Sequence, residues 1–209
     1  MINISIVLPC YNRIDQTIQT INLLLNSKGL NKDFLLEIIV SDSSLDNKLE
    51  IAVKEKFSDK VRYFKPEKPG IAANKNAGAK IASYPILIFC DSDMEVEPNT
   101  ITNTMNSLNK NKTAAGIGGQ VVWKNGEKNS TLDRPRKEDR TVTIGNTTYI
   151  EALYSRYFTT HKKVFFDVGG YDEEVFNMRG EGSDLSIRYW RAGYPLVYDP
   201  SIIVHHVFD

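Results

Sequence analysis

The chain has 209 residues, of which 41% are hydrophobic and 25% are charged, a composition typical of a soluble globular domain. Lysine plus arginine and aspartate plus glutamate both number 26, so no net field would draw the chain to nucleic acid or to an acidic membrane. Met1 is followed by a strand-like apolar run rather than a signal peptide, and no apolar run reaches the length of a membrane span. These features predict a single cytosolic domain that recognises its partners through a local site.

The first half of the chain alternates apolar runs with segments of helical periodicity. This pattern is typical of βα units that build a mostly parallel sheet. Strands are predicted at 4–10, 35–42, 61–64 and 85–91. The helices predicted after them carry apolar residues at helical spacing, namely Ile14, Ile18, Ile21 and Leu25, then Leu49, Val53 and Phe57, then Ala73, Ala77 and Ile81, and finally Ile101, Met105 and Leu108 behind Pro98 in the first turn.

Three of these strands end in polar segments, "PCYNR", "SDSS" and "DSD". In an open parallel sheet the carboxyl ends of the strands share one edge, where ligands bind. Two of the strands also end at a cysteine or pass through one, Cys10 and Cys90, and each is expected to be a small buried hydrophobe rather than part of a disulfide or a zinc site.

The second half of the chain has a different pattern. A strand is predicted at 116–123, and "TVTIGNTTYI" at 141–150 predicts a hairpin that turns at Gly145 and Asn146. The charged run 133–140 is interpreted as a solvated loop, with a site for an acidic ligand as the alternative. A last helix is predicted from an N-cap at Ser183 to Gly193.

The end of the fourth strand, "PILIFCDSDMEVEP", places Asp91 and Asp93 two positions apart. In an extended chain their carboxylates face the same side, roughly 6 to 7 Å apart. Their repulsion would be roughly 2 to 3 kcal/mol at an effective dielectric constant near 20. A divalent cation, a lysine or arginine neighbour, a helix cap or solvent could offset this repulsion.

Five segments in this order carry a resemblance to a known family: "ISIVLPCYNR", "VSDSSLDN", "PGIAANKNAGAKIA", "LIFCDSDMEVEP" and "VGGYDEEVF" with "GEGSDLSIRYWRAGY". Together they resemble the family-two glycosyltransferases of the GT-A fold over almost the whole chain. The resemblance implies an α/β domain with a Rossmann-like, mostly parallel central sheet flanked by helices and a small antiparallel hairpin element. It also implies one domain over 1–209, with a nucleotide-sugar-binding half at 1–110 and an acceptor-side half at 111–209.

The resemblance implies a nucleotide-diphosphate sugar as donor and a divalent metal, Mn²⁺ or Mg²⁺, that bridges the aspartates of "DSD" to the diphosphate. Oxygen ligands suit such hard cations, and a diphosphate leaving group needs its charge neutralised. Asp93 is expected to be the metal ligand, whereas Asp91 is expected to orient the ribose or sugar or to bind the metal through water. Many relatives carry a further metal-binding histidine after the last strand, and His205 is preferred here over His206, which faces the other side of an extended chain.

Further nucleotide contacts are implied by position. Pro9, Tyr11 and Arg13 lie in the loop that holds the nucleoside in the family, where Tyr11 offers a ring face to a base and Arg13 could meet phosphate. Simple turn chemistry is the alternative for this loop. Asp42 matches the aspartate that reads the base and would select uracil or thymine.

The segment "ANKNAG" matches the helix start at which the family has A-R-N-x-G, with Lys75 in place of the arginine and Asn76 matching directly. Lysine keeps the charge but loses the planar fork of arginine. Both residues are expected to contact the nucleotide, with helix packing and a solvated lysine as the alternative.

The segment "GEGSDLSIRYW" departs from the family. Relatives carry an acid followed by the aspartate that acts as general base, but here Glu181 is followed by Gly182. Glu181 is preferred as the base, with Asp184 as the second catalytic candidate; Asp184 could also be an acid placed to suit the helix dipole. Trp190, on the same helix, is expected in the core rather than as a platform for a sugar.

The function implied is an inverting, metal-dependent transfer of a sugar from a nucleotide-diphosphate donor, with a UDP-sugar favoured, to a hydroxyl of a glycan, a lipid-linked sugar or a protein. One alternative is a sugar-nucleotide binding module with impaired catalysis, which Gly182 favours. The other is a sugar nucleotidyltransferase, which would need a glycine-rich loop that "PCYNR" lacks. Relatives continue beyond the last strand, so the chain is expected to be one domain of a longer polypeptide whose other regions could reach a membrane surface.

Overall fold

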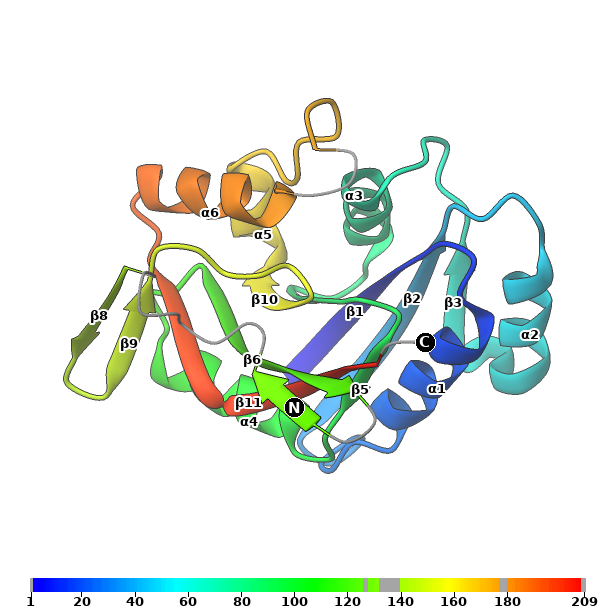
Figure 1. Cartoon of the computed structure of the whole chain (residues 1–209), viewed down its shortest axis with the longest axis horizontal. Coiled ribbons are helices and arrows are strands. Elements are labelled where there is room, and N and C mark those ends of the chain that lie inside the picture. Colours follow the sequence, from blue (N-terminus) through cyan, green and yellow to red (C-terminus); the bar gives the residue numbers. More distant parts are fainter. Residues whose placement is uncertain (1, 126–127, 132–139, 177–179, 208–209) are drawn as a thin grey trace.

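Eleven strands and six α-helices are present in a computed structural model that describes residues 2–125, 128–131, 140–176 and 180–207 (Figure 1). The strands are β1 Ile2–Cys10, β2 Phe34–Asp42, β3 Val61–Phe64, β4 Ile86–Cys90, β5 Met94–Val96, β6 Gly116–Asn125, β7 Lys128–Thr131, β8 Thr141–Ile144, β9 Thr147–Ile150, β10 Tyr157–His161 and β11 Leu196–Val207. The helices are α1 Ile14–Leu25, α2 Lys48–Phe57, α3 Ile71–Ile81, α4 Thr100–Lys110, α5 Lys162–Asp167 and α6 Glu181–Arg191, and a 3₁₀ turn, η1, covers Ser58–Lys60.

All the strands belong to one sheet. Its order is β3-β2-β1-β4-β10-β6-β11-β9-β8, with β5 beside β11 and β7 beside β6. The first four strands in this order are parallel, β10 runs antiparallel to both of its neighbours, and β6 and β11 are again parallel. The predicted α/β class and the β8–β9 hairpin are therefore confirmed.

Helices cover both faces of the sheet. Helices α1, α2 and α4 pack on one face, and α3, α5 and α6 pack on the other (Figure 1). Strand β1 contributes to both cores, because Ile4, Ile6 and Leu8 join the first apolar cluster and Val7 joins the second. A parallel strand buried on both faces reads as a continuous apolar run, which is why the sequence pattern located β1.

Small residues on α3 let this helix approach the sheet closely. A Cβ atom at Gly78 would lie 2.3 Å from Cγ1 of Val7, so only glycine fits without a shift. The small-residue face of "ANKNAG" therefore packs α3 against β1 at the edge of the sheet where β1 ends.

Several predicted boundaries need correction. Helix α4 begins at Thr100 rather than at Pro98, because the Thr100 hydroxyl accepts a hydrogen bond from the backbone N–H of Glu97 and closes the turn before the helix. Helix α6 begins at Glu181 rather than behind a cap at Ser183, since Gly180 supplies a left-handed residue, φ 92°, just before it. The charged run 133–140 lies outside the described residues except for Arg140.

The prediction of two buried cysteines is confirmed. Cys10 and Cys90 are both buried and free of disulfides. Within the described parts of the chain, none of the helices combines the length and the apolar character needed to cross a membrane.

Candidate active site

A cleft of about 550 Å³ lies where β1, β2 and β4 end, the edge predicted to bind ligands. Pro9, Tyr11, Arg13 and Asp91 line it. Their role in binding a nucleotide stays a prediction. Tyr11 is 57% exposed, so its ring face is available to stack on a planar ligand. Asn74, which was not predicted from the sequence, also lines the cleft.

Two hydrogen bonds from its amide nitrogen fix the side chain of Asn74. Its Nδ2 donates to the carbonyl of Cys10 at 3.2 Å and to Oγ of Ser43 at 3.1 Å, while its Oδ1 is buried without a hydrogen-bond partner in the described residues. A buried acceptor without a partner is costly, so it marks a place for a donor from a ligand or water. The sequence feature that could have pointed to Asn74 is its place as the first asparagine of "ANKNAG".

Asp93 is the centre of a charged cluster beside this cleft. Its Oδ2 pairs with the guanidinium of Arg13 and lies 3.3 Å from Nε2 of His206. Burial acts to raise the pKa of Asp93, but the hydrogen bond and charge of His206 and the charge of Arg13 outweigh it and lower the pKa below its usual value. Asp93 is therefore a carboxylate at neutral pH.

The structure corrects the prediction for the two histidines. His206, not His205, faces Asp93, and Nε2 of His205 instead lies 3.0 Å from Oε1 of Glu97. Successive residues of a strand point to opposite faces, and the pairing of β11 with β5 sets His206 opposite Met94, which follows Asp93. His205 is turned away from the "DSD" cluster by the same register.

The residues around Asp93 fit a hard divalent cation. Oδ1 of Asp93 is buried and has no hydrogen-bond partner in the described residues, and the carboxylate oxygen and the imidazole nitrogen of His206 are ligand types that Mn²⁺ accepts. The described part of the chain contains no cluster of three or more histidine, cysteine or acidic residues that could hold a metal. A cation at Asp93 and His206 would thus need further ligands from an anionic substrate or water.

Asp42 is fully buried at the end of β2. Its Oδ1 accepts hydrogen bonds from the backbone N–H and the hydroxyl of Ser44, at 2.9 and 2.5 Å, and its Oδ2 accepts one from the hydroxyl of Tyr63 at 2.9 Å. Three protein donors therefore surround this carboxylate. Its role in reading a nucleobase stays a prediction.

Lys75 is placed differently from the prediction of a nucleotide contact. It is fully buried, and its Nζ lies 3.5 Å from Oδ1 of Asp91, 3.3 Å from Oε1 of Glu181 and 3.1 Å from the carbonyl oxygen of Ser155. Its ammonium also lies 5.5 Å from the ring centroid of Tyr171. Lys75 at Asp91 and Arg13 at Asp93 are thus the positive neighbours that offset the repulsion at the end of β4.

The two carboxylates that Lys75 joins have opposite pKa shifts. Burial raises the pKa of Asp91, with Lys75 opposing and the charge of Asp93 adding to the effect. Burial also acts to raise the pKa of Glu181, but the charge of Lys75 and the hydrogen bond from Ser155 outweigh it and lower the pKa. Glu181 is thus held ionised, the state that a general base requires.

Asn76 and Asp184 are engaged elsewhere. Asn76 binds the acceptor-side loop 169–174, because its Nδ2 donates to the carbonyl of Tyr171 at 2.8 Å and to Oε1 of Glu173 at 2.7 Å. Both Asn76 and Lys75 lie outside the lining of the cleft. Asp184 accepts two hydrogen bonds from Arg188, at 2.9 and 2.6 Å, so its charge is paired within α6. Of the two catalytic candidates, Glu181 is the one joined to the "DSD" segment.

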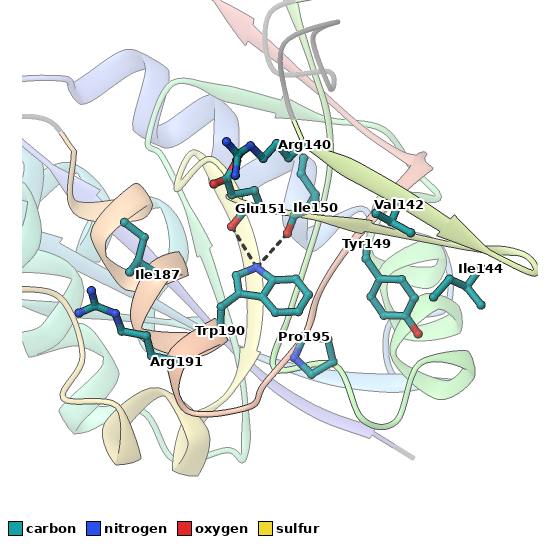
Figure 2. Close-up of a pocket in the computed structure, with 10 residues that line it drawn as sticks. All are labelled: Arg140, Val142, Ile144, Tyr149, Ile150, Glu151, Ile187, Trp190, Arg191 and Pro195. Atoms are coloured by element: carbon teal, nitrogen blue, oxygen red, sulfur yellow. Dashed lines mark hydrogen bonds and ion pairs between the residues drawn. The ribbon is translucent and has the colours of Figure 1, made fainter.

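A second, apolar groove of about 600 Å³ lies between the β8–β9 hairpin and the C-terminal half of α6 (Figure 2). Trp190 lines it and is 39% exposed, so the prediction that Trp190 is a core residue is wrong. Its Nε1 donates to the carbonyls of Ile150 and Glu151, at 3.1 and 3.0 Å, which fixes the indole against β9 (Figure 2). Trp190 therefore lies between α6 and β9 with part of its ring exposed.

Comparison with solved structures gives the fold. A crystal structure of GalNAc-T7 with UDP, GalNAc and Mn²⁺ superimposes with a TM-score of 0.82 at 19% identity, over 99% of this chain and 44% of that one. The mannosyltransferase PcManGT from Pyrobaculum calidifontis, in complex with GDP-Man and Mn²⁺, matches with a TM-score of 0.73 at 17% identity, over 97% and 56% of the two chains. These likenesses identify the GT-A fold.

Curated relatives match at the sequence level. The chain is 26% identical over 205 residues to polypeptide N-acetylgalactosaminyltransferase 3 of Mus musculus, covering 82% of this chain but only 31% of the mouse protein. It is 28% identical over 185 residues to GalNAc(5)-diNAcBac-PP-undecaprenol beta-1,3-glucosyltransferase of Campylobacter jejuni, covering 84% of this chain and 57% of that protein. The family model described as glycosyl transferase family 2 matches residues 5–171, which is most of the chain. The chain therefore belongs to glycosyl transferase family 2 and has the GT-A fold.

Proposed function

We propose that this chain transfers a sugar from a nucleotide-diphosphate donor to a hydroxyl acceptor, with the donor bound in the cleft at the ends of β1, β2 and β4. The observation that carries this proposal is the buried Asp93 carboxylate, with one oxygen lacking a hydrogen-bond partner in the described residues, beside a cleft lined by Tyr11 and Arg13. A carboxylate, a guanidinium and an aromatic ring match the three parts of a metal-bound nucleoside diphosphate: cation, phosphate and base.

Each group has a role in donor binding. Tyr11 stacks on the base, Asn74 offers its Oδ1 to a donor group of the nucleoside, and the guanidinium of Arg13 binds a phosphate. Asp93 and His206 hold a divalent cation, Mn²⁺ or Mg²⁺, and Asp91 orients the sugar or ribose. The bound cation supplies neutralisation of the charge that develops on the diphosphate.

Glu181 acts as the general base. The acceptor hydroxyl gives its proton to Glu181 as its oxygen bonds to the anomeric carbon, and the bond from that carbon to the diphosphate oxygen breaks. The nucleoside diphosphate leaves, and attack from the face opposite to it inverts the anomeric centre. The ionised state of Glu181 next to Lys75 supports this assignment.

We favour a UDP-sugar as donor. Support comes from the relatives named N-acetylgalactosaminyltransferases and from the UDP in the GalNAc-T7 structure, whereas the GDP-Man in the mannosyltransferase structure is the competing case. The relatives' names also suggest the acceptor classes, a polypeptide in one and a lipid-linked glycan in another. The cleft lies within 1–110 and Glu181 within 111–209, which supports a donor half and an acceptor half of one domain.

Calorimetric titration with UDP, GDP, CDP and dTDP, each with and without Mn²⁺, tests the donor site. We expect one diphosphate to bind in a Mn²⁺-dependent manner and Asp93→Ala to abolish that dependence. Binding without turnover of any sugar nucleotide would favour the binding-module alternative that Gly182 suggests. No Mn²⁺-dependent binding of the four would contradict the proposed function.

A further inference from the structure

The residue after Glu181 lacks a side chain, and the structure has another segment in the space that a side chain would take. A Cβ atom at Gly182 would lie 3.1 Å from Cβ of Ser155, 3.2 Å from the carbonyl oxygen of Leu153 and 3.3 Å from the backbone nitrogen of Ser155. The segment from Leu153 to Ser155 thus packs directly on the first turn of α6. A side chain at position 182 would crowd this segment, which would have to shift to admit it.

The same close packing brings a hydroxyl to Glu181. Oγ of Ser155 donates to Oε1 of Glu181 at 2.6 Å, a short hydrogen bond of the kind expected with a carboxylate. The carbonyl of Ser155 accepts a hydrogen bond from Nζ of Lys75 at 3.1 Å, and that ammonium lies 3.3 Å from the same Oε1. Ser155 therefore contacts both charged partners of one buried ion pair.

Lys75 extends this arrangement to the donor side. Its Nζ lies 3.5 Å from Asp91, at the end of β4, and the lysine is fully buried between the two carboxylates. A buried ion pair keeps its charges only when additional hydrogen bonds complete its coordination. The hydroxyl and carbonyl of Ser155 supply two of those hydrogen bonds.

We infer that Ser155 is a positioning residue for the catalytic base: together with Lys75 it fixes Oε1 of Glu181 at a set place relative to Asp91, and it does so in the space that Gly182 leaves open. The inference rests on the proposed function, because it takes Glu181 as the base. It adds that a serine from the segment between β9 and β10 orients this base.

The test uses water as the acceptor, so no acceptor needs to be known. With Mn²⁺ and UDP-N-acetylgalactosamine, UDP-glucose or GDP-mannose, the oxygen of water bonds to the anomeric carbon, the bond to the diphosphate breaks and the water proton passes to Glu181. Release of UDP or GDP gives kcat and KM for the wild type, Ser155→Ala, Glu181→Gln and the double variant Ser155→Ala/Glu181→Gln.

We expect Ser155→Ala to lower kcat about tenfold, since misplacing a reacting group by a small distance has an effect of this order or larger. Its KM for the donor should stay within about twofold, because the nucleotide cleft is unchanged. Since Ser155 acts through Glu181, the double variant should have the same kcat as Glu181→Gln alone.

Ser186→Ala is the matched control. Oγ of Ser186 accepts a hydrogen bond from the backbone N–H of Leu153 at 3.1 Å and donates to the carbonyl of Gly182 at 2.8 Å, so this buried serine ties together the same segment and the same helix without contacting Glu181. We expect its kcat to stay within about twofold of the wild type.

An unchanged kcat in Ser155→Ala, an additive loss in the double variant, or an equal loss in Ser186→Ala would each overturn the positioning role while leaving the proposed function in place. A wild type that neither binds nor hydrolyses any of the three sugar nucleotides would overturn the proposed function, and the positioning role with it.

Discussion

Arg13 and Asp93 lie 80 positions apart in the chain and form an ion pair beside the cleft at the ends of β1, β2 and β4. The side chain of Arg13 is half exposed, at 51%, whereas that of Asp93 is buried, at 4%. The guanidinium therefore has room to move and the carboxylate does not. A cation that binds Asp93 competes with the positive charge of Arg13 for this carboxylate, and a diphosphate in the cleft would give the guanidinium another partner.

Arg13→Gln should therefore bind Mn²⁺ more tightly than the wild type when no nucleotide is present. We expect a gain of about fivefold, the equivalent of removing one competing, partly exposed ion pair of roughly 1 kcal/mol. The enhancement of Mn²⁺ binding by UDP should shrink in the same variant. Titration of free Mn²⁺ by electron paramagnetic resonance, with and without UDP, measures both effects.

Arg62→Gln is the control for the loss of charge, because Arg62 pairs with Glu37 at 3.4 Å and lines a different pocket. Its Mn²⁺ affinity should match the wild type. Equal affinities in Arg13→Gln and the wild type would contradict the competition between Arg13 and the metal.

The two adjacent histidines should behave differently. His206→Ala should weaken Mn²⁺-dependent nucleotide binding at least tenfold, because His206 lies 3.3 Å from Asp93 and would supply a metal ligand. His205→Ala should leave it within about twofold, since the partner of His205 is Glu97. Calorimetric titration of each variant with UDP and Mn²⁺ checks this, and the reverse order of effects would restore the original choice of His205.

An aspartate at position 182 should lower both the stability and the activity of the protein. Gly182→Asp introduces a Cβ into a space where three atoms lie within 3.3 Å, so we expect a loss of about 1 to 3 kcal/mol in the free energy of unfolding. Hydrolysis of the sugar nucleotide should fall as well, because Ser155 is pushed away from Glu181. Denaturation in urea and the UDP-release assay measure the two effects.

Ser183→Asp serves as the comparison for Gly182→Asp, since Ser183 is the next residue in the same helical turn and is exposed. An acid there also suits the helix dipole, so stability should change by less than about 1 kcal/mol. A Gly182→Asp variant as stable and as active as the wild type would refute the steric argument.

Glu37 gives a prediction about pH that is independent of the function. Oε2 of Glu37 accepts hydrogen bonds from Oγ of Ser5 at 2.5 Å and from the backbone N–H of Ser83 at 2.7 Å, and its Oε1 accepts one from Oγ of Ser83 at 2.9 Å. Burial acts to raise the pKa of Glu37, but these hydrogen bonds and the charge of Arg62 lower it below the ordinary value of 4.5. Glu37 thus binds a proton less tightly in the folded state than in the unfolded state.

The direction of the pH dependence of stability follows from this difference in pKa between the folded and unfolded states. A carboxyl whose pKa is lowered by folding stabilises the protein above the unfolded pKa, and this stabilisation is lost as the pH falls through the folded pKa. Glu37→Gln should therefore lower the free energy of unfolding by about 1 to 3 kcal/mol near neutral pH, with the gap to the wild type closing below pH 4.5. Urea denaturation across this pH range checks the prediction. Glu50→Gln, which loses one ion pair with Lys54 on α2, is the control, and its free energy of unfolding should fall by only about 0.5 kcal/mol. A gap that stays constant with pH would contradict the prediction.

The sequence located the parallel part of the sheet well, because strands buried on both faces leave continuous apolar runs such as 86–90. It missed β10, which lies between β4 and β6, the strand that begins at Gly116. The pairing of β10 with β4 joins Tyr157 to Cys90 and is set by contacts far apart in the chain. Such pairings cannot be predicted from local hydrophobic periodicity.

The candidate site was likewise predictable from the sequence only in part. The positions of Tyr11, Arg13 and Asp91 around the cleft followed from the ends of the strands. The identity of the histidine that faces Asp93 depended on the register of β11 with β5, and the partner of Lys75, Glu181, lies 106 positions away. Each of these contacts is decided by tertiary packing, so the sequence could offer the residues but not their neighbours.

The contact between Ser155 and Gly182 also constrains how this protein can evolve. A side chain gained at position 182 crowds Leu153 and Ser155, so that segment must shift to admit it. The two positions are therefore expected to vary together, and homologues that carry an acid at 182 should also differ at the position equivalent to Ser155. Covariation of positions 155 and 182, which are 27 residues apart in the sequence, would show that this contact has constrained the evolution of the chain.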